Sequence, residues 1–242
     1  MRVPATVLSK LALYPMSRRN LTRELAELRH LLLTMSDIVT EQFSDSVDAL
    51  LECDLKKADA VIERDNEVDS LELKIDQQCE RILALYQPVA IDLRLLIVVV
   101  KVNTDLERMG DHCRNLARNV KHVKDTPEVL EHTRLRELSE ACRDILAEAR
   151  RSFLERDHTL AQEVPSFDER VNKLHRENFE RLVEFCRTHP EKAEPAAHLI
   201  TASKAIERIG DHAKNIAKCV VFLIEGEDVR HASLQEAGEE EE

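Results

Sequence analysis

Two acidic pairs recur along this chain, each with a glutamate four residues before an aspartate. Glu107 and Asp111 form the first pair, and Glu207 and Asp211 form the second. On an α-helix, residues four apart lie on the same face, so the two carboxylates of a pair point the same way. Carboxylate oxygens on a rigid scaffold are the ligands that hard divalent or trivalent cations require. The spacing therefore predicts metal binding in two places.

The two acidic pairs belong to one segment that occurs twice, one hundred residues apart. Residues 107–120 and 207–220 share the order Glu, Arg, an apolar residue, Gly, Asp and His, and continue with matching apolar positions. A second match, shifted by 103 residues, places 50–54 opposite 153–157. Self-similarity at a fixed spacing indicates a repeated structural unit. We therefore predict two similar units of roughly one hundred residues, each large enough to bury a core.

The composition indicates that these units are helical. The 242 residues include only 4 glycines, 7 prolines and no tryptophan, and 34% are charged, which favours long helices with short connections. Apolar residues at helical spacing predict three helices in each copy. The predicted helices cover about 20–50, 55–86 and 88–124, then 130–156, 158 or 165–188, and 195–225. We expect an all-α fold of two tandem, pseudo-symmetric three-helix bundles.

The breaks between these helices also predict the domain boundaries. Four glutamates end the chain, and their mutual repulsion and lack of apolar neighbours predict disorder. The first twenty residues are interrupted by prolines and lack a convincing cleavage region, so they read as a loose extension, and Met16 is an alternative start. The expected division is an N-terminal extension over 1–19, a first bundle over 20–124, a second over 125–231 and an acidic tail over 232–242.

Charge and hydropathy exclude several classes of protein. The net charge of −12 and the absence of a basic stripe argue against nucleic-acid binding. The longest apolar run, residues 95–100, is far shorter than the roughly 18 residues of a membrane span. Six scattered cysteines without a Cys-x-x-Cys pair are typical of buried thiols in a reducing compartment. We therefore expect a cytoplasmic protein.

The repeated motif can be placed on a helical wheel. Glu107 and Asp111 fall on the side opposite the apolar residues, so the carboxylates are expected to face away from the core. His112 and His212 fall on another face and are expected to pack against helices rather than bind the metal. A glycine beside each acidic pair costs about 1 kcal/mol relative to alanine in a helix. Close packing of a neighbouring helix and a role in the acidic site explain that glycine equally well.

Two carboxylates are too few for a stable site with oxygen ligands, so a second pair should come from a neighbouring helix. Asp65 and Asp69 have the required spacing in the first copy. The aligned residues of the second copy are Asp168 and Asn172. Because an amide replaces one carboxylate there, the second site is expected to bind more weakly.

The chain resembles the PhoU family of phosphate-signalling proteins. The resemblance rests on Gln-Pro-Val-Ala-Ile-Asp-Leu-Arg at 87–94, on Asp-Leu-Glu-Arg-Met-Gly-Asp at 105–111 and on its repeat at 205–211, and it covers about 20–231. It implies metal ions, Mg, Mn or Fe, in both bundles. The residues implied are Asp65, Asp69, Glu107 and Asp111 in the first bundle and Asp168, Glu207 and Asp211 in the second.

The resemblance implies a regulator rather than an enzyme. Members of this family are thought to repress phosphate uptake and the phosphate-starvation response when phosphate is plentiful. The implied partners are the ATPase subunit of the phosphate transporter and a sensor histidine kinase, with membrane association only through these partners. A homodimer is also implied, and no nucleic acid is involved.

Two other classes of protein remain open from the sequence. A helical structural adaptor would carry the same acids as solvated surface, without metal. A ferritin-like di-iron carboxylate oxidase would need paired Glu-x-x-His helices. The chain contains Glu27 with His30 and Glu155 with His158, but these pairs are not equivalent under the repeat. Metal analysis would separate the three classes.

Overall fold

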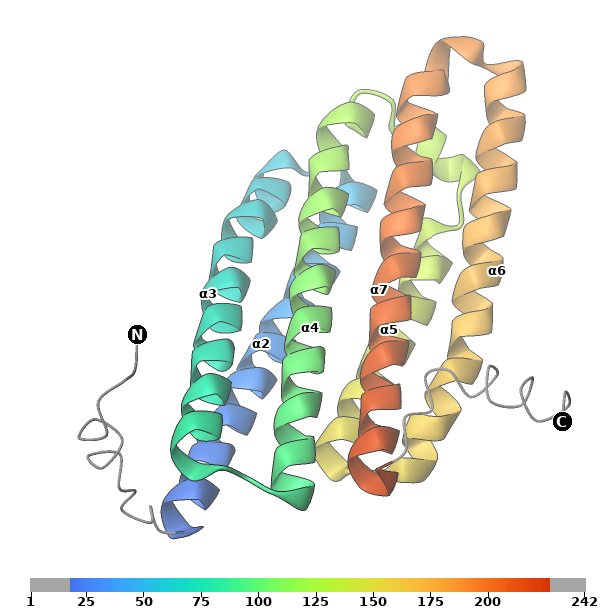
Figure 1. The fold of residues 1–242 in the computed structure, drawn as a ribbon. Helices are drawn as coiled ribbons and strands as arrows, with labels where there is room; N and C mark the ends of the chain where they lie inside the picture. The colour runs from blue at the N-terminus through green and yellow to red at the C-terminus, as the bar shows by residue number, and fades with distance from the viewer. Residues whose placement is uncertain (1–17, 227–242) are drawn as a thin grey trace, which may run out of the picture.

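The protein is almost entirely helical in a computed structural model that describes residues 18–226 (Figure 1). The helices are α2 (Arg18–Glu52), α3 (Leu55–Tyr86), α4 (Ala90–Val123), α5 (Leu135–Glu155), α6 (His158–Thr188) and α7 (Ala193–Glu225), with 3₁₀ turns η1 (Pro127–His132) and η2 (Pro190–Lys192). Helices α2 to α4 pack together, as do α5 to α7, which confirms the all-α fold of two tandem three-helix bundles. The predicted acidic tail, and all but two residues of the predicted extension, lie outside the described residues.

The match between 50–54 and 153–157 encodes the same corner in both bundles. Asp54 caps α3 by accepting hydrogen bonds from the backbone amides of Lys56 and Lys57, at 2.8 and 3.1 Å. Asp157 caps α6 by accepting one from Leu160 at 3.0 Å. The residue before each cap is left-handed, with φ of 55° at position 53 and 53° at position 156. A short polar cap after a left-handed residue ends one helix and starts the next, which explains why this segment repeats.

Several helix boundaries differ from the predicted ones. Helix α4 begins at Ala90, so Pro88 precedes it rather than occupying its first turn. The helix expected from Leu130 begins at Leu135, because residues 127–132 form a 3₁₀ turn instead. Helix α6 begins at His158 and continues through Pro165. These differences change connections but not the order of the helices.

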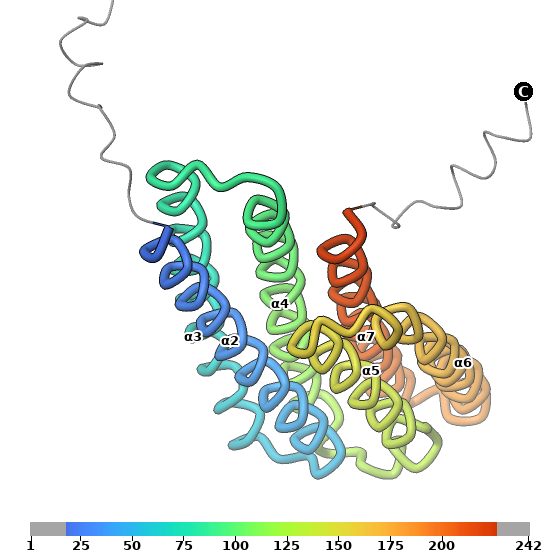
Figure 2. Tube along the Cα trace, turned by 90° about the horizontal axis from the view of Figure 1, so that it is seen from below, coloured from blue at the N-terminus to red at the C-terminus, as the bar shows by residue number. Residues whose placement is uncertain are grey.

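The two bundles join along one seam between α4 and α7. These helices lie side by side in the middle of the molecule in both views, while α3 and α6 lie at opposite outer edges (Figures 1 and 2). The rings of His112 and His212, which are equivalent under the repeat, are 5.6 Å apart across the seam. His212 Nδ1 donates to Asp105 Oδ1 at 2.8 Å. The buried apolar residues of both bundles form one continuous core, so the repeats share their interior.

Ion pairs between α2 and α5 also link the bundles. Arg150 Nη2 lies 2.5 Å from Asp37 Oδ1, and Arg143 Nη2 lies 3.6 Å from Asp48 Oδ1. No helix between residues 18 and 226 combines the length and the apolar character needed to cross a membrane.

Candidate metal-binding grooves

The structure brings the four predicted acids of the first bundle together between α3 and α4, in what we call the first groove. Asp65 on α3 is buried, with 3% of its surface exposed, and Asp111 on α4 is close enough for its charge to act on Asp65. The Arg114 guanidinium donates to the carboxylates of both. Asp69 is exposed at the rim, close enough for its charge to act on Glu107. Carboxylates on two rigid helices are the kind of ligand that a hard cation binds, although no three of these acids place ligand atoms within 4.8 Å of one another in the described part of the chain.

The sequence analysis missed two further acids of the first groove, Glu72 and Asp76. They continue the same face of α3, seven and eleven residues after Asp65, so helical spacing alone could have found them. Asn103 on α4 ties this part of α3 in place, because its amide donates to Asp76 Oδ1 at 2.9 Å and to the backbone oxygen of Glu72 at 3.1 Å. The groove is therefore a row of six carboxylates. They are Asp65, Asp69, Glu72, Asp76, Glu107 and Asp111.

The negative charge of the first groove is only partly neutralised. Burial is the largest cause that raises the pKa of Asp65, against the opposing effects of Gln42 and Arg114. Burial, followed by the charges of neighbouring acids, also raises the pKa of Glu72 and of Glu107. A raised carboxyl pKa means that the local environment destabilises the charged carboxylate. A bound cation would stabilise the charged form and lower the pKa again.

An unsatisfied oxygen lies on the floor of the first groove. Gln42 on α2 donates from Nε2 to Asp65 Oδ1 and to the backbone oxygen of Val61, both at 3.3 Å. Its other amide atom, Oε1, is buried and has no hydrogen-bond partner among the described residues. Buried polar atoms are nearly always satisfied, by protein, water or an ion. The donor set therefore fits a site built for an additional polar or ionic occupant.

Gly110 allows α3 and α4 to approach at the first groove. A Cβ atom at this position would lie 3.2 Å from Asp65 Oδ1 and 3.2 Å from Val68 Cγ1. At Gly210, the equivalent position, the nearest atom would be Val171 Cγ1 at 3.5 Å, an ordinary contact. Both explanations proposed from the sequence therefore hold for Gly110. It allows a neighbouring helix to pack closely, and it leaves room for Asp65 of the acidic site.

We expect the two glycines to respond differently to alanine. Gly210→Ala should raise the free energy of unfolding by up to about 1 kcal/mol, because alanine favours the helix and fits the available space. Gly110→Ala should gain less or lose stability, because Asp65 and Val68 must move. Urea unfolding followed by far-ultraviolet circular dichroism measures both. Equal stabilisation by the two substitutions would contradict the close approach at Gly110.

The second groove, between α6 and α7, has the same plan with a different internal cation. Asp168 is buried, and Lys214, the equivalent of Arg114, donates to Asp168 Oδ2 at 2.5 Å and to Asp211 Oδ1 at 2.9 Å. Burial lowers the pKa of Lys214, but its hydrogen bonds to the two aspartates outweigh this and raise it overall. Asn172 donates from Nδ2 to Asp168 Oδ2 at 2.9 Å. An ammonium and an amide therefore already pair with one oxygen of the buried carboxylate, whereas the other oxygen, Asp168 Oδ1, has no hydrogen-bond partner among the described residues.

Basic side chains surround the second groove where acids or neutral residues surround the first. Lys204 Nζ lies 2.8 Å from Glu207 Oε1, and position 104 of the first copy is a threonine. The residues that line the open side of the second groove are Glu169, Arg170, Asn172, Lys173, His175, Arg176 and Glu207. His175 and Arg176 replace Glu72 and a leucine of the first copy. The two grooves thus differ in the sign of the charge around them.

The carboxylates are less exposed than the helical wheel predicted. Of the four carboxylates placed on the wheel, Glu207 has 8% of its surface exposed, and Glu107, Asp111 and Asp211 are half-buried. The wheel identifies the face opposite the apolar stripe of α4 or α7, but α3 or α6 covers part of that face. The histidines of the motif lie at the seam between α4 and α7, as expected of packing residues.

The structure disfavours the arrangement of a ferritin-like oxidase. Glu155 is the last residue of α5 and His158 is the first of α6, with left-handed Arg156 between them. The two residues therefore do not share a helix face. Only Glu27 and His30, both on α2, remain of the two predicted pairs.

Comparisons with known proteins agree on one family. A family model described as the PhoU domain matches residues 32–120 and 135–220. A protein of Pseudomonas aeruginosa named phosphate-specific transport system accessory protein PhoU homolog is 36% identical over 218 residues, covering 90% of each chain. A protein of the same name from Aquifex aeolicus is 33% identical over 219 residues, covering 90% of this chain and 99% of its own.

Two crystal structures share the fold. The structure of PhoU from Pseudomonas aeruginosa superposes with a TM-score of 0.79 at 33% identity, covering 85% of this chain and 99% of that one. The phosphate transport system regulatory protein PhoU from Streptococcus pneumoniae gives a TM-score of 0.74 at 26% identity, covering 86% and 99%. The similarity spans both bundles and both grooves.

Proposed function

Because the chain belongs to the PhoU family, we propose that it represses phosphate uptake and the phosphate-starvation response when phosphate is plentiful. Its relatives are named accessory or regulatory proteins of the phosphate transport system, and these names support a regulatory role. The proposal assigns no catalytic step to the chain.

The regulatory surface that we propose is the first groove with a bound Mg, Mn or Fe ion. Asp65, Asp69, Glu107 and Asp111 would hold the ion, and it would supply positive charge to a surface that otherwise repels itself. The observation that supports this most directly is a row of six carboxylates in a groove where Arg114 bridges only two of them, and the raised pKa of Asp65, Glu72 and Glu107 agrees with it. Without the ion, Arg114 joins α3 to α4; with it, Arg114 would share the acids.

The second groove is proposed to contribute a site of lower affinity for cations. Asp168, Glu207 and Asp211 are the acids available there, and Lys214 and Lys204 already neutralise them. A cation would have to displace an ammonium group that is held by two aspartates. One architecture would therefore carry two unequal sites.

The proposed partners are the ATPase subunit of the phosphate transporter and a sensor histidine kinase, between which the chain would act as an adaptor. The relatives' association with the phosphate transport system supports the first of these. A homodimer would present two copies of each groove to the partners.

Deletion of the gene should leave phosphate-responsive promoters active in phosphate-rich medium, because the repressing link is lost. A reporter fused to such a promoter measures this, with the wild-type gene supplied in trans as the control. Normal repression in the deletion strain would refute the regulatory role. Full complementation by a Glu107→Gln, Asp111→Asn variant that has lost metal would instead support a structural adaptor that works without the ion.

A further inference from the structure

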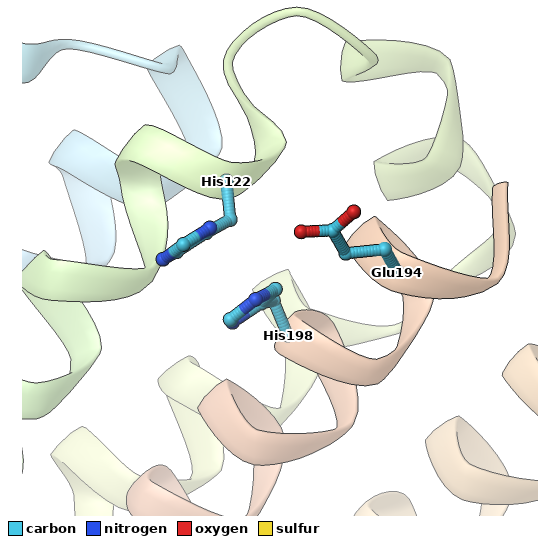
Figure 3. A group of neighbouring side chains, drawn as sticks. All are labelled: His122, Glu194 and His198. Atoms are coloured by element: carbon cyan, nitrogen blue, oxygen red, sulfur yellow. The ribbon is translucent and has the colours of Figure 1, made fainter.

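Three potential metal ligands meet at one end of the seam between the bundles. His122 lies near the end of α4, and Glu194 and His198 lie in the first two turns of α7 (Figure 3). One ligand atom from each residue can be chosen so that all three lie within 4.8 Å of one another. Glu194 and His198 are four residues apart, so they share a face of α7. None of these residues belongs to either acidic groove.

A buried asparagine fixes the protonation of one imidazole. Asn119 donates from Nδ2 to the backbone oxygen of Asn115 at 2.8 Å, which leaves its Oδ1 facing His198. His198 Nδ1 lies 2.8 Å from that oxygen and therefore donates its proton to it. In a neutral imidazole the other nitrogen, Nε2, then carries a free lone pair. Metal-binding histidines are oriented in this way by a hydrogen bond on the nitrogen that does not bind the metal.

The second imidazole is placed next to the first but can turn. The rings of His122 and His198 are stacked, with centroids 3.7 Å apart and planes 4° apart. Lone pairs in parallel planes cannot both point at one ion, so one ring must rotate for joint coordination. Asn119 holds His198, whereas His122 is exposed and makes no hydrogen bond within residues 18–226. Rotation of His122 alone would bring its nitrogen toward the ion.

The other end of the seam lacks these ligands. Under the shift of 100 residues, Arg94, Val98 and Phe222 correspond to Glu194, His198 and His122. At that end the Lys101 ammonium lies 4.9 Å from the centre of the Phe222 ring. The ligand set therefore occurs at one end only and is not a by-product of the duplicated motif.

We propose that His122, Glu194 and His198 bind a divalent transition-metal ion of the zinc type. Two imidazoles and a carboxylate favour Zn²⁺ or Co²⁺ over Mg²⁺, which prefers oxygen ligands in an octahedral shell. Three protein ligands leave a fourth position open to water or to a group from outside. The ion would join α4 of the first bundle to α7 of the second, beside the ion pair of Lys192 with Glu128 at 2.6 Å.

Cobalt spectroscopy in excess Mg²⁺ tests this site separately from the acidic grooves. Metal-free protein is titrated with Co²⁺, and four-coordinate cobalt is followed by its visible absorption. We expect saturation near one equivalent and loss of the signal when Zn²⁺ is added. Glu194→Gln, an exposed position that leaves the core intact, should abolish saturation near one equivalent, as should His198→Ala. Asn119→Ala should weaken binding roughly 10- to 100-fold.

Two control variants complete the design. His30→Ala removes an exposed histidine of α2, and it should leave the cobalt signal unchanged. The Glu107→Gln, Asp111→Asn variant should also keep the signal, because those acids lie in the first groove. Absorption that persists in Glu194→Gln and His198→Ala, that is lost in the groove variant, or that never saturates near one equivalent would overturn the proposal. Loss of Mg²⁺ or Mn²⁺ binding in the groove variant would not affect it.

Discussion

Replacing Glu107 by Gln together with Asp111 by Asn should lower the affinity of the protein for Mn²⁺ by more than 100-fold. The reason is that both carboxylates contributed by α4 are lost, whereas removing even a supporting residue of a metal site costs about 10- to 100-fold. The amides keep the size of the side chains, so the helices need not rearrange. Isothermal titration of metal-free protein measures the change.

The duplication provides a matched control for this prediction. Glu207→Gln with Asp211→Asn makes the same chemical change in the second groove, where Lys214 and Lys204 already pair with the acids. It should reduce the total Mn²⁺ binding only slightly. An equal loss in both double variants would contradict the inequality of the grooves.

The Mn²⁺ affinity of the first groove should also fall as the pH is lowered from neutrality. The pKa values of Asp65, Glu72 and Glu107 are raised, so these acids hold protons at a higher pH than ordinary carboxyl groups do. Binding a cation releases those protons, so affinity rises with pH and is lost as pH falls through the raised values. The same titration at several pH values measures this effect.

Arg114→Met should lower the free energy of unfolding of the metal-free protein by about 3 kcal/mol at neutral pH. Removing one partner of a buried ion pair leaves an uncompensated charge and costs about 3–5 kcal/mol, and the low end applies because the Arg114 side chain is 26% exposed. Gln42 would remain as a hydrogen-bond donor to Asp65. Urea unfolding by circular dichroism is suitable, since the chain has no tryptophan.

Added Mn²⁺ should restore part of the stability that Arg114→Met removes, because the ion binds the folded state and replaces the missing positive charge. Arg187→Met is the control, since Arg187 pairs with Glu184 on the surface of α6, where both side chains are mostly exposed. It should change stability by less than about 1 kcal/mol. If Arg114→Met lowered the free energy of unfolding by as little as Arg187→Met does, the Arg114 bridge would not stabilise the fold.

The architecture could be predicted from the sequence because its determinants are local. Apolar spacing located the helices, and the match between 50–54 and 153–157 marked a corner that the structure shows to be capped by Asp54 and Asp157. The boundaries that differed lie where local signals conflict, as at the 3₁₀ turn over 127–132. Proline at the start of a segment indicates a break but not which kind of turn follows.

The candidate grooves could be predicted only in part. Four of the six acids of the first groove were predicted from spacing, but the bridge from Arg114 to Asp65 depends on how α3 packs against α4. A helical wheel describes one helix and cannot show that a neighbour buries its polar side. The cluster at His122 and His198 joins residues 76 positions apart on two helices, so no local pattern indicates it.

The shared seam has a consequence for how such a protein can diversify. A single repeat that associated with itself through the surface of α4 would form a two-fold dimer, with His112 and its mate across the axis, as His112 and His212 are here. In such a dimer every substitution appears twice. Joining the copies in one chain removes that restriction, so basic side chains can surround one groove while acids surround the other, and one end of the axis can gain histidines alone. Covalent fusion thus lets a symmetric framework carry unlike sites.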